Sequence, residues 1–444
     1  MNKEIPSLKK IWEIAWPIII SMLAQNIVGV TDTAFLGRVG EAELGGSAIG
    51  GLFYIILFMV GFGFTTGVQI LVARRYGEKD YGRIGNIFDN SFYFLAITSF
   101  VVTFLIMFLA PPLLKVIVAS EAIYNTSAVY LKYRIFGLFF ATGTLLFRSF
   151  YTGINFTRYL SASSAIMAGV NVFLDYGLIF GKFGFPEMGI AGAAIASAIS
   201  EVVALTFLFV ITFRNPRLKQ YQLFKWVRPE WKEIKSTLEV SVFVMIQFVL
   251  SLSVWFIFFL IIEKMGERPL AVSNIARSIY MFLMIPGWAL ASVTNSMVSN
   301  VIGEGKKEQV LPVAMRIIGF SSLLLIGVVS LAALFPHSII GIFTNDQSLI
   351  LATIPTFYII LGALLMFSLS SILFNAVLGT GNTRVTLIIE IITLVIYVVY
   401  TWFIAIFLQK PIELVWTSEW IYAIFLGILS FLYLKKGKWR ERVI

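Results

Sequence analysis

The chain consists of long apolar stretches separated by short clusters of charged residues, glycine and proline. Each stretch holds roughly the 20 residues that a helix needs to cross a bilayer. The stretches are continuously apolar and do not alternate as barrel strands do, so helices are the expected form. The pattern therefore predicts an all-α integral membrane protein with twelve transmembrane helices, at residues 11–37, 46–73, 88–110, 122–147, 159–181, 189–213, 236–262, 271–301, 310–335, 349–378, 385–408 and 412–434.

Composition supports the same class of protein. Of the 444 residues, 59% are hydrophobic and only 13% are charged, whereas soluble domains carry roughly 25% charged residues. The absence of cysteine excludes disulfides and cysteine-based metal or redox sites. The segment Gly303-Glu-Gly-Lys-Lys307 lacks the spacing and the Ser or Thr of a phosphate-binding loop. We therefore expect a protein that is not an enzyme and has no cofactor or resident metal, and that draws on an ion gradient.

The net charge of +10 raises the possibility of a nucleic-acid partner, and the placement of the basic residues argues against it. Of the 34 Lys and Arg, 25 fall on the termini and even-numbered connections, six on the opposite connections and three within spans. By the positive-inside rule, this excess predicts cytoplasmic N- and C-termini in the plasma (inner) membrane. The expected partner is the lipid bilayer, and the first apolar stretch is expected to be a retained span.

The two halves of the chain are related by an internal repeat, in which positions of the first half recur in the second at one constant offset without a gap. We interpret the chain as two pseudo-symmetric six-helix bundles, with an N-terminal lobe at 1–213, a cytoplasmic linker at 214–235 and a C-terminal lobe at 236–444. The matched pairs are Ser47/Ser273, Ile49/Ile275, Tyr54/Tyr280, Gly61/Gly287, Val72/Val298, Gly77/Gly303, Glu78/Glu304, Gly153/Gly379, Thr157/Thr383 and Arg158/Arg384.

Two aspartates lie within predicted spans, where an ionisable group costs several kcal/mol and marks a functional site by default. Asp32 is in the first span and Asp175 in the fifth, with Asn171 one helical turn before Asp175. Carboxylates with neutral polar neighbours can hold a proton or coordinate a dehydrated Na⁺. These three residues are the predicted cation-coupling site, and the residues alone favour neither ion.

Four further residues are expected to support this site. Gln25 precedes Asp32 on one helical stripe, Ser197 and Glu201 form an i, i+4 pair in the sixth span, and Pro17 permits a kink or hinge in the first. A second interpretation makes the acids interfacial, or pairs them structurally with Lys132 or Arg134 of the fourth span.

The second half offers weaker candidates. The repeat aligns Asp32 and Asp175 with Phe258 and Thr401, so no acid corresponds to either. Gln247 and Asn375 are possible cavity-lining residues, although hydrogen bonds between helices are an equally available use. Glu390, six residues after Arg384, is expected to reach the cytoplasmic interface.

In the order and spacing of its motifs, the sequence resembles the multidrug and toxic compound extrusion (MATE) transporters over essentially its full length. These motifs are Trp16-Pro17, Val30-Thr-Asp-Thr-Ala-Phe-Leu-Gly37, Gly77-Glu-Lys-Asp80, Asn171-Val-Phe-Leu-Asp175, Gly189-Ile-Ala-Gly-Ala-Ala-Ile-Ala-Ser197, Ile285-Pro-Gly287 and Gly303-Glu-Gly-Lys306. The resemblance implies two six-helix lobes arranged as a V around a central cavity. It also implies exchange of organic cations or amphipathic drugs for H⁺ or Na⁺ by alternating access.

Within that family the chain looks like the DinF branch, whose coupling acids lie in the first and fifth helices. This implies coupling at Asp32, Asn171 and Asp175, a bend at Pro17 and a helix 6 hydroxyl at Ser197. We expect a monomer. Two alternatives remain open from the sequence: a lipid-linked oligosaccharide flippase of related fold, and a membrane scaffold or receptor that does not transport.

Overall fold

The computed structural model describes residues 5–225 and 228–441, and all regular secondary structure in these ranges is helical. The helices of the first half are α1 (Leu8–Val39), α2 (Glu41–Glu78), α3 (Tyr81–Ile117), α4 (Glu121–Arg134), η1 (Ile135–Gly137), α5 (Leu138–Gly153), α6 (Arg158–Phe180), α7 (Gly189–Arg214) and η2 (Pro216–Tyr221). The later helices are α8 (Trp231–Glu263), α9 (Glu267–Leu283), α10 (Ile285–Gly303), η3 (Lys307–Gln309), α11 (Val310–Leu334), α12 (Pro336–Gly341), α13 (Gln347–Gly379), α14 (Thr383–Trp402), η4 (Phe403–Phe407), α15 (Ile412–Val415), α16 (Ser418–Lys436) and η5 (Lys438–Glu441).

These helices confirm the predicted membrane spans. Within the described ranges, 11 helices are long and apolar enough to cross a bilayer, and the bent pair α9 and α10 brings the number to 12. The angle at that break is 47°. Pro286, in the first turn of α10, explains the break, because proline lacks an amide hydrogen and clashes with the preceding helical turn. Every predicted apolar stretch overlaps one of these spans.

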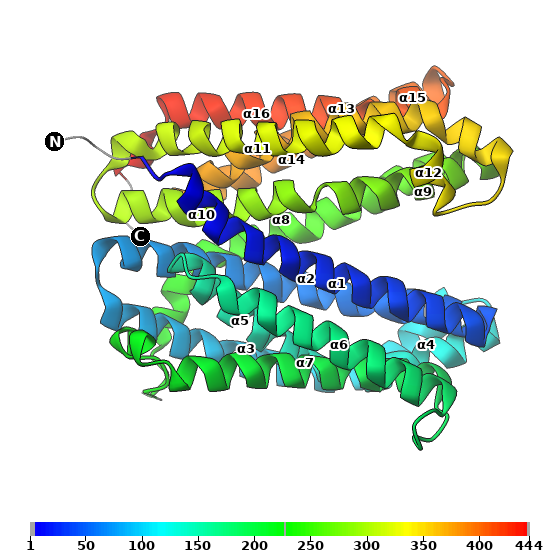
Figure 1. Ribbon diagram of the computed structural model, residues 1–444, viewed down its shortest axis with the longest axis horizontal. Coiled ribbons are helices and arrows are strands. Elements are labelled where there is room, and N and C mark those ends of the chain that lie inside the picture. The colour runs from blue at the N-terminus through cyan, green and yellow to red at the C-terminus, as the bar shows by residue number, and fades with distance from the viewer. Residues whose placement is uncertain (1–4, 226–227, 442–444) are drawn as a thin grey trace. The chain divides into compact units, whose positions relative to one another are not determined.

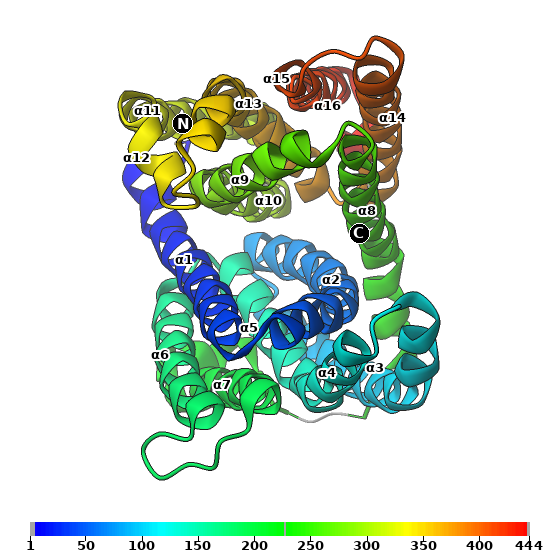
Figure 2. The same ribbon diagram turned by 90° about the vertical axis from the view of Figure 1, so that its right-hand side faces the viewer.

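The chain divides into two compact units. The N-terminal unit comprises Trp16–Met245, and the C-terminal unit comprises the residues up to Ala15 together with Ile246–Ile444. In the N-terminal unit α6 lies beside α7, and in the C-terminal unit α14 lies beside α16 (Figures 1 and 2). The lobe boundaries at 213 and 236 stay a prediction, and residues 226–227 of the expected linker lie outside the described residues.

The internal repeat is visible in the bounds of the helices and in one packing contact. Helices α2 and α9 begin at the repeat-related positions Glu41 and Glu267, and α5 and α13 end at the repeat-related positions Gly153 and Gly379. A Cβ atom on Gly153 would meet Val72 Cγ1 at 2.7 Å, and one on Gly379 would meet Val298 Cβ at 3.0 Å. Glycine therefore permits the same close helix contact in both units.

The segment after α7 is held against α3 by buried polar side chains. Asp89 accepts a hydrogen bond from the backbone nitrogen of Phe224 at 2.9 Å, and Asn90 accepts one from that of Glu230 at 2.7 Å. Both acceptor residues are 1% exposed. A Cβ atom on Gly85 would lie 2.4 Å from the carbonyl oxygen of Tyr221, so only glycine allows this backbone approach.

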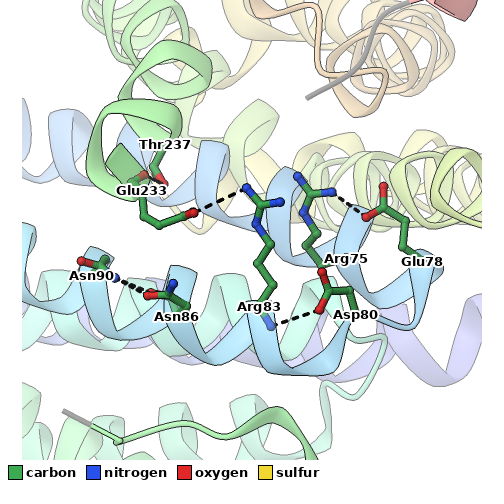
Figure 3. A network of polar contacts seen from close by, with 8 residues as sticks. All are labelled: Arg75, Glu78, Asp80, Arg83, Asn86, Asn90, Glu233 and Thr237. Carbon is green, nitrogen blue, oxygen red and sulfur yellow. Dashed lines mark hydrogen bonds and ion pairs between the residues drawn. The ribbon is translucent and has the colours of Figure 1, made fainter. Parts of the chain in front are cut away.

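Figure 3 shows the polar contacts around the turn between α2 and α3. Asp80 caps α3 by accepting a hydrogen bond from the backbone nitrogen of Arg83 at 3.4 Å. The guanidinium group of Arg83 reaches Glu233 on α8 at 3.5 Å (Figure 3). Arg75 pairs with Glu78 at 2.5 Å within α2. The contact between Arg83 and Glu233 connects the start of α8 to the α2–α3 turn within the N-terminal unit.

The tight glycine contact in the C-terminal unit predicts a stability effect. We expect Gly379→Ala to destabilise the protein by about 1–3 kcal/mol, because the new Cβ overpacks a filled interface. It would lie 2.6 Å from the backbone oxygen of Asn295, which cannot rotate away. The measurement is the thermal unfolding midpoint of the purified protein in detergent.

Gly319→Ala on α11 is the matched control, because nothing lies within 4 Å of its added Cβ. It should be neutral or stabilising, since alanine favours helix. Equal midpoints for the two variants would contradict the packing argument.

Candidate functional site

The centre of the candidate site is a pair of polar residues on α6. Asn171 and Asp175 lie one turn apart and are both 0% exposed. Helix α7 packs closely on α6 because Gly192 lacks a side chain, and a Cβ there would lie 2.6 Å from the carbonyl oxygen of Leu178. This contact holds the predicted helix 6 hydroxyl, that of Ser197, next to the α6 pair.

Asp32 on α1 completes the cluster. The hydroxyl of Ser197 donates to Asp32 Oδ2 at 3.2 Å and accepts from the side-chain nitrogen of Asn171 at 3.3 Å. Asp32 also lies near enough to Asp175 for the two carboxyl groups to interact electrostatically. Three helices therefore bring together four of the residues singled out in the sequence. Asp32 is half-buried, whereas the other three residues are buried.

The carboxamide of Asn171 suits both protonation states of the aspartates. When the amide is turned so that its nitrogen faces the aspartates and no longer faces Ser197, it donates to Asp32 Oδ1 and to Asp175 Oδ2, each at 3.2 Å. With its oxygen turned to them, it can accept from a protonated carboxyl group instead. Asp175 Oδ1 is buried and has no hydrogen-bond partner among the described residues. The Asn171 amide can thus remain hydrogen-bonded to the aspartates whether or not they carry a proton or a cation.

Neither aspartate forms an ion pair with a basic residue in the described parts of the chain, and Arg134 has a different partner. Arg134 forms a two-pronged ion pair with Glu201, at 2.9 Å and 2.6 Å. Tyr54 on α2 donates to the same carboxylate at 2.9 Å, and its ring lies 3.6 Å from the guanidinium carbon. Arg134 therefore neutralises Glu201.

The Glu201 ion pair sits at the break in the fourth span. Helix α4 ends at Arg134, and the 3₁₀ turn η1 ends at Gly137, where a Cβ would meet Glu201 Oε2 at 2.2 Å. Glu201 follows Ser197 by one turn of α7, so the pair adjoins the aspartate cluster through that helix. Glu201, expected as a supporting polar residue, is thus found in a mostly buried ion pair beside the cluster, with side-chain exposures of 11% for Arg134 and 12% for Glu201.

The remaining predicted residues of the first span have different environments. Gln25 is exposed on α1, at a shallow hollow lined by that helix alone. Pro17 is buried inside α1, two residues after Ala15, where the chain passes from the C-terminal to the N-terminal unit.

The candidates in the second half belong to the C-terminal unit. Gln247 is 6% exposed, and its side-chain oxygen has no partner among the described residues. Asn375 donates to the backbone oxygen of Ser371 in its own helix at 2.9 Å. This hydrogen bond does not join two helices, and it does not indicate a cavity.

Two glutamates of the C-terminal unit depart from the sequence interpretation. Glu390 was expected at the cytoplasmic interface, but it is 2% exposed and accepts hydrogen bonds from Ser251 and Tyr422. Its distance from Arg384 along the chain did not show which way its side chain faces. Glu419, 4% exposed, was missed, although an acid inside the apolar stretch 412–434 is the kind of signal that identified Asp32.

These features define a class of protein: a membrane transporter made of two helical units, with a buried acidic site in the first. A model of the MatE family matches residues 17–177 and 244–403. Because this match covers more than half of the chain, the chain belongs to the MatE family of membrane transporters, which are not enzymes.

Curated relatives agree with the family assignment. The chain is 28% identical to the probable multidrug resistance protein NorM of Thermotoga maritima, over 100% of this chain and 96% of that protein. It is 27% identical to the multidrug resistance protein NorM of Burkholderia vietnamiensis, over 84% of this chain and 82% of that protein. Assignment to the DinF branch stays a prediction.

Solved structures show the same fold. A MOP superfamily transporter from Pyrococcus furiosus, whose reported feature is a binding pocket of reverse polarity, has a TM-score of 0.89 at 19% identity, covering 98% of this chain and 97% of that one. A MATE crystal structure in the straight conformation has a TM-score of 0.87 at 19% identity, covering 97% and 95%.

The ion pair between Arg134 and Glu201 predicts an asymmetric response to mutation. We expect Arg134→Met alone to destabilise the protein by about 3–5 kcal/mol, because it leaves a buried carboxylate without a partner. The double variant Arg134→Met/Glu201→Gln should recover much of that loss. The measurement is the thermal unfolding midpoint in detergent. A double variant no more stable than the single variant would show that the stacking of Arg134 on Tyr54, and not its charge, is the main contribution.

Proposed function

We propose that the protein exports organic cations or amphipathic compounds in exchange for H⁺ or Na⁺ by alternating access. The single observation that carries this proposal is the cluster of Asp32, Asn171, Asp175 and Ser197, which has no basic partner among the described residues. The multidrug resistance names of the relatives support the substrate class.

The cluster suggests how the ion acts. An outward-open protein loads a proton or Na⁺ between Asp32 and Asp175, which removes the repulsion between their carboxylates. Because Asp32 lies on α1, the loaded and empty states favour different positions of this helix. Pro17 removes one backbone hydrogen bond of α1 and supplies a point at which the helix can bend. Movement of α1 would then change access to bound substrate.

The charge distribution favours a protein of the plasma (inner) membrane with both termini in the cytoplasm, and we propose that it works as a monomer. The flippase alternative needs free basic groups for a pyrophosphate. Arg134 is neutralised by Glu201, and Arg277 lies 4.9 Å from the ring of Phe259. The ion pair with Glu201 makes Arg134 unavailable to a pyrophosphate, which counts against the flippase alternative.

Removal of the charge at the cluster tests the proposal. We expect Asp32→Asn or Asp175→Asn to abolish gradient-driven efflux, because an amide cannot alternate between loaded and empty states. The measurement is export of a fluorescent cationic dye from reconstituted vesicles. Asp346→Asn is the matched control: Asp346 caps α13 on the exposed surface, and Asn caps equally well, so efflux should be unchanged. Normal efflux in Asp32→Asn would contradict the proposed role of this residue.

Imposed gradients identify the coupling ion. In vesicles with a pH gradient and no Na⁺, efflux is expected if the cluster exchanges protons. With a Na⁺ gradient at equal pH, efflux is expected if carboxylate and amide oxygens coordinate Na⁺. Each gradient is dissipated with an ionophore as its control. Dye export that needs neither gradient would contradict the antiport mechanism.

A further inference from the structure

A cavity of about 260 Å³ lies between the second half of α3 and the second half of α4, inside the N-terminal unit. Apolar side chains line it, among them Met107, Ala110 and Leu114 of α3 and Ala128 and Val129 of α4. Among the described lining residues, only Lys132 is charged. The cavity is smaller than the roughly 300–1,000 Å³ of pockets that enclose drug-sized ligands. Its size and lining suit a single hydrocarbon chain.

The cavity adjoins a surface of α3 that faces lipid. Phe104, Phe108 and Val116 of this helix are exposed, and in a membrane-spanning helix such side chains contact acyl chains. Helix α3 has 37 residues, which makes it about 55 Å long at about 1.5 Å per residue. Because the hydrocarbon core is only about 30 Å thick, the end of α3 extends into the head-group layer. The cavity therefore lies close to the head groups of one leaflet.

The Lys132 side chain is a cation without a counter-ion in the protein. It is exposed on α4, and its nitrogen lies 5.6 Å from the centre of the Tyr133 ring. Within the described ranges its ammonium group forms neither an ion pair nor a hydrogen bond, and the nearby Glu201 is already paired with Arg134. An unpaired charge inside a span is costly, and the flexible lysine side chain can extend toward the head groups. Lys132 therefore favours an anionic lipid.

The backbone of α3 supplies a second polar feature at the same place. Pro111 and Pro112 lie inside this helix. Proline has no amide hydrogen, so the carbonyl oxygens of Met107 and Phe108, four residues earlier, lack the donor that a regular helix supplies. Met107 is one of the cavity residues. A carbonyl oxygen in hydrocarbon without a donor is costly, and a hydroxyl group on a lipid head group can supply one.

We propose that this cavity binds one acyl chain of an anionic glycerophospholipid, whose phosphate pairs with Lys132 and whose glycerol head group donates to the backbone of α3 at Met107. The lipid belongs to the leaflet that contains the end of α3 and the start of α4, which lie side by side (Figure 2). A free phosphate ion would leave the apolar walls uncovered, and Lys132 would repel an organic cation. The site is separate from the aspartate cluster, which lies on α1, α6 and α7.

The test is native mass spectrometry of the purified full-length protein with added phosphatidylglycerol or phosphatidylcholine of identical acyl chains. We expect the protein to retain one phosphatidylglycerol in preference to phosphatidylcholine. Lys132→Gln should weaken binding of phosphatidylglycerol about tenfold, because a charge-assisted contact is lost. Val129→Trp should weaken binding of both lipids, because Val129 is exposed at the cavity and a larger side chain there fills it.

Lys264→Gln is the matched control, since it removes an exposed lysine of the C-terminal unit. It should bind both lipids as the unchanged protein does, and inorganic phosphate should not displace the lipid. Equal binding of phosphatidylglycerol by Lys132→Gln and the unchanged protein would overturn the proposal. Equal retention of the two lipids, or displacement by inorganic phosphate, would overturn it as well. If Val129→Trp does not fold, Lys132→Gln still decides the outcome, because its side chain is exposed.

Discussion

The constraint on which this structure depends is that hydrocarbon provides no hydrogen-bond partner for a polar group. It requires the backbone to be helical wherever it crosses the membrane, and it requires each buried acid to have donors or a counter-ion. Asp175 lies beside Asn171, Glu201 has Arg134 and Tyr54, and Glu390 and Glu419 have tyrosines. The polar contacts inside both units follow from this requirement.

The spans were predictable from the sequence because apolar length is a local property of the chain. Helix interruptions were harder to predict, since they depend on neighbours. Pro286 indicates the break between α9 and α10 in the sequence. The 3₁₀ turn η1 contains no proline, so the sequence does not indicate it. That turn lies where Gly137 lets the Glu201 carboxylate approach the backbone, a contact made between residues far apart in the sequence.

The candidate site was partly predictable for a related reason. A polar residue inside an apolar span must face protein, so Asp32, Asn171, Asp175 and Ser197 were expected to share an interior. Their partners could not be assigned, because a partner depends on how each helix is rotated about its axis. For Glu390, the sequence showed its distance from a helix end but not that its face turns toward α16.

The two units differ chemically even though their helices repeat. The Gly153–Val72 and Gly379–Val298 contacts preserve the same backbone approach, so duplication retained the packing. The charged groups differ: the N-terminal unit holds Asp32, Asp175 and the ion pair of Glu201 with Arg134, whereas Glu390 and Glu419 of the C-terminal unit accept hydrogen bonds from hydroxyl groups. Close packing fixes the positions of neighbouring atoms to within fractions of an ångström. A buried charge requires only that nearby groups of opposite charge, or hydrogen-bond donors, compensate it. A buried arginine of one unit can therefore align with an apolar residue of the other, as Arg134 aligns with Ile360, when the acidic residues around that position differ as well.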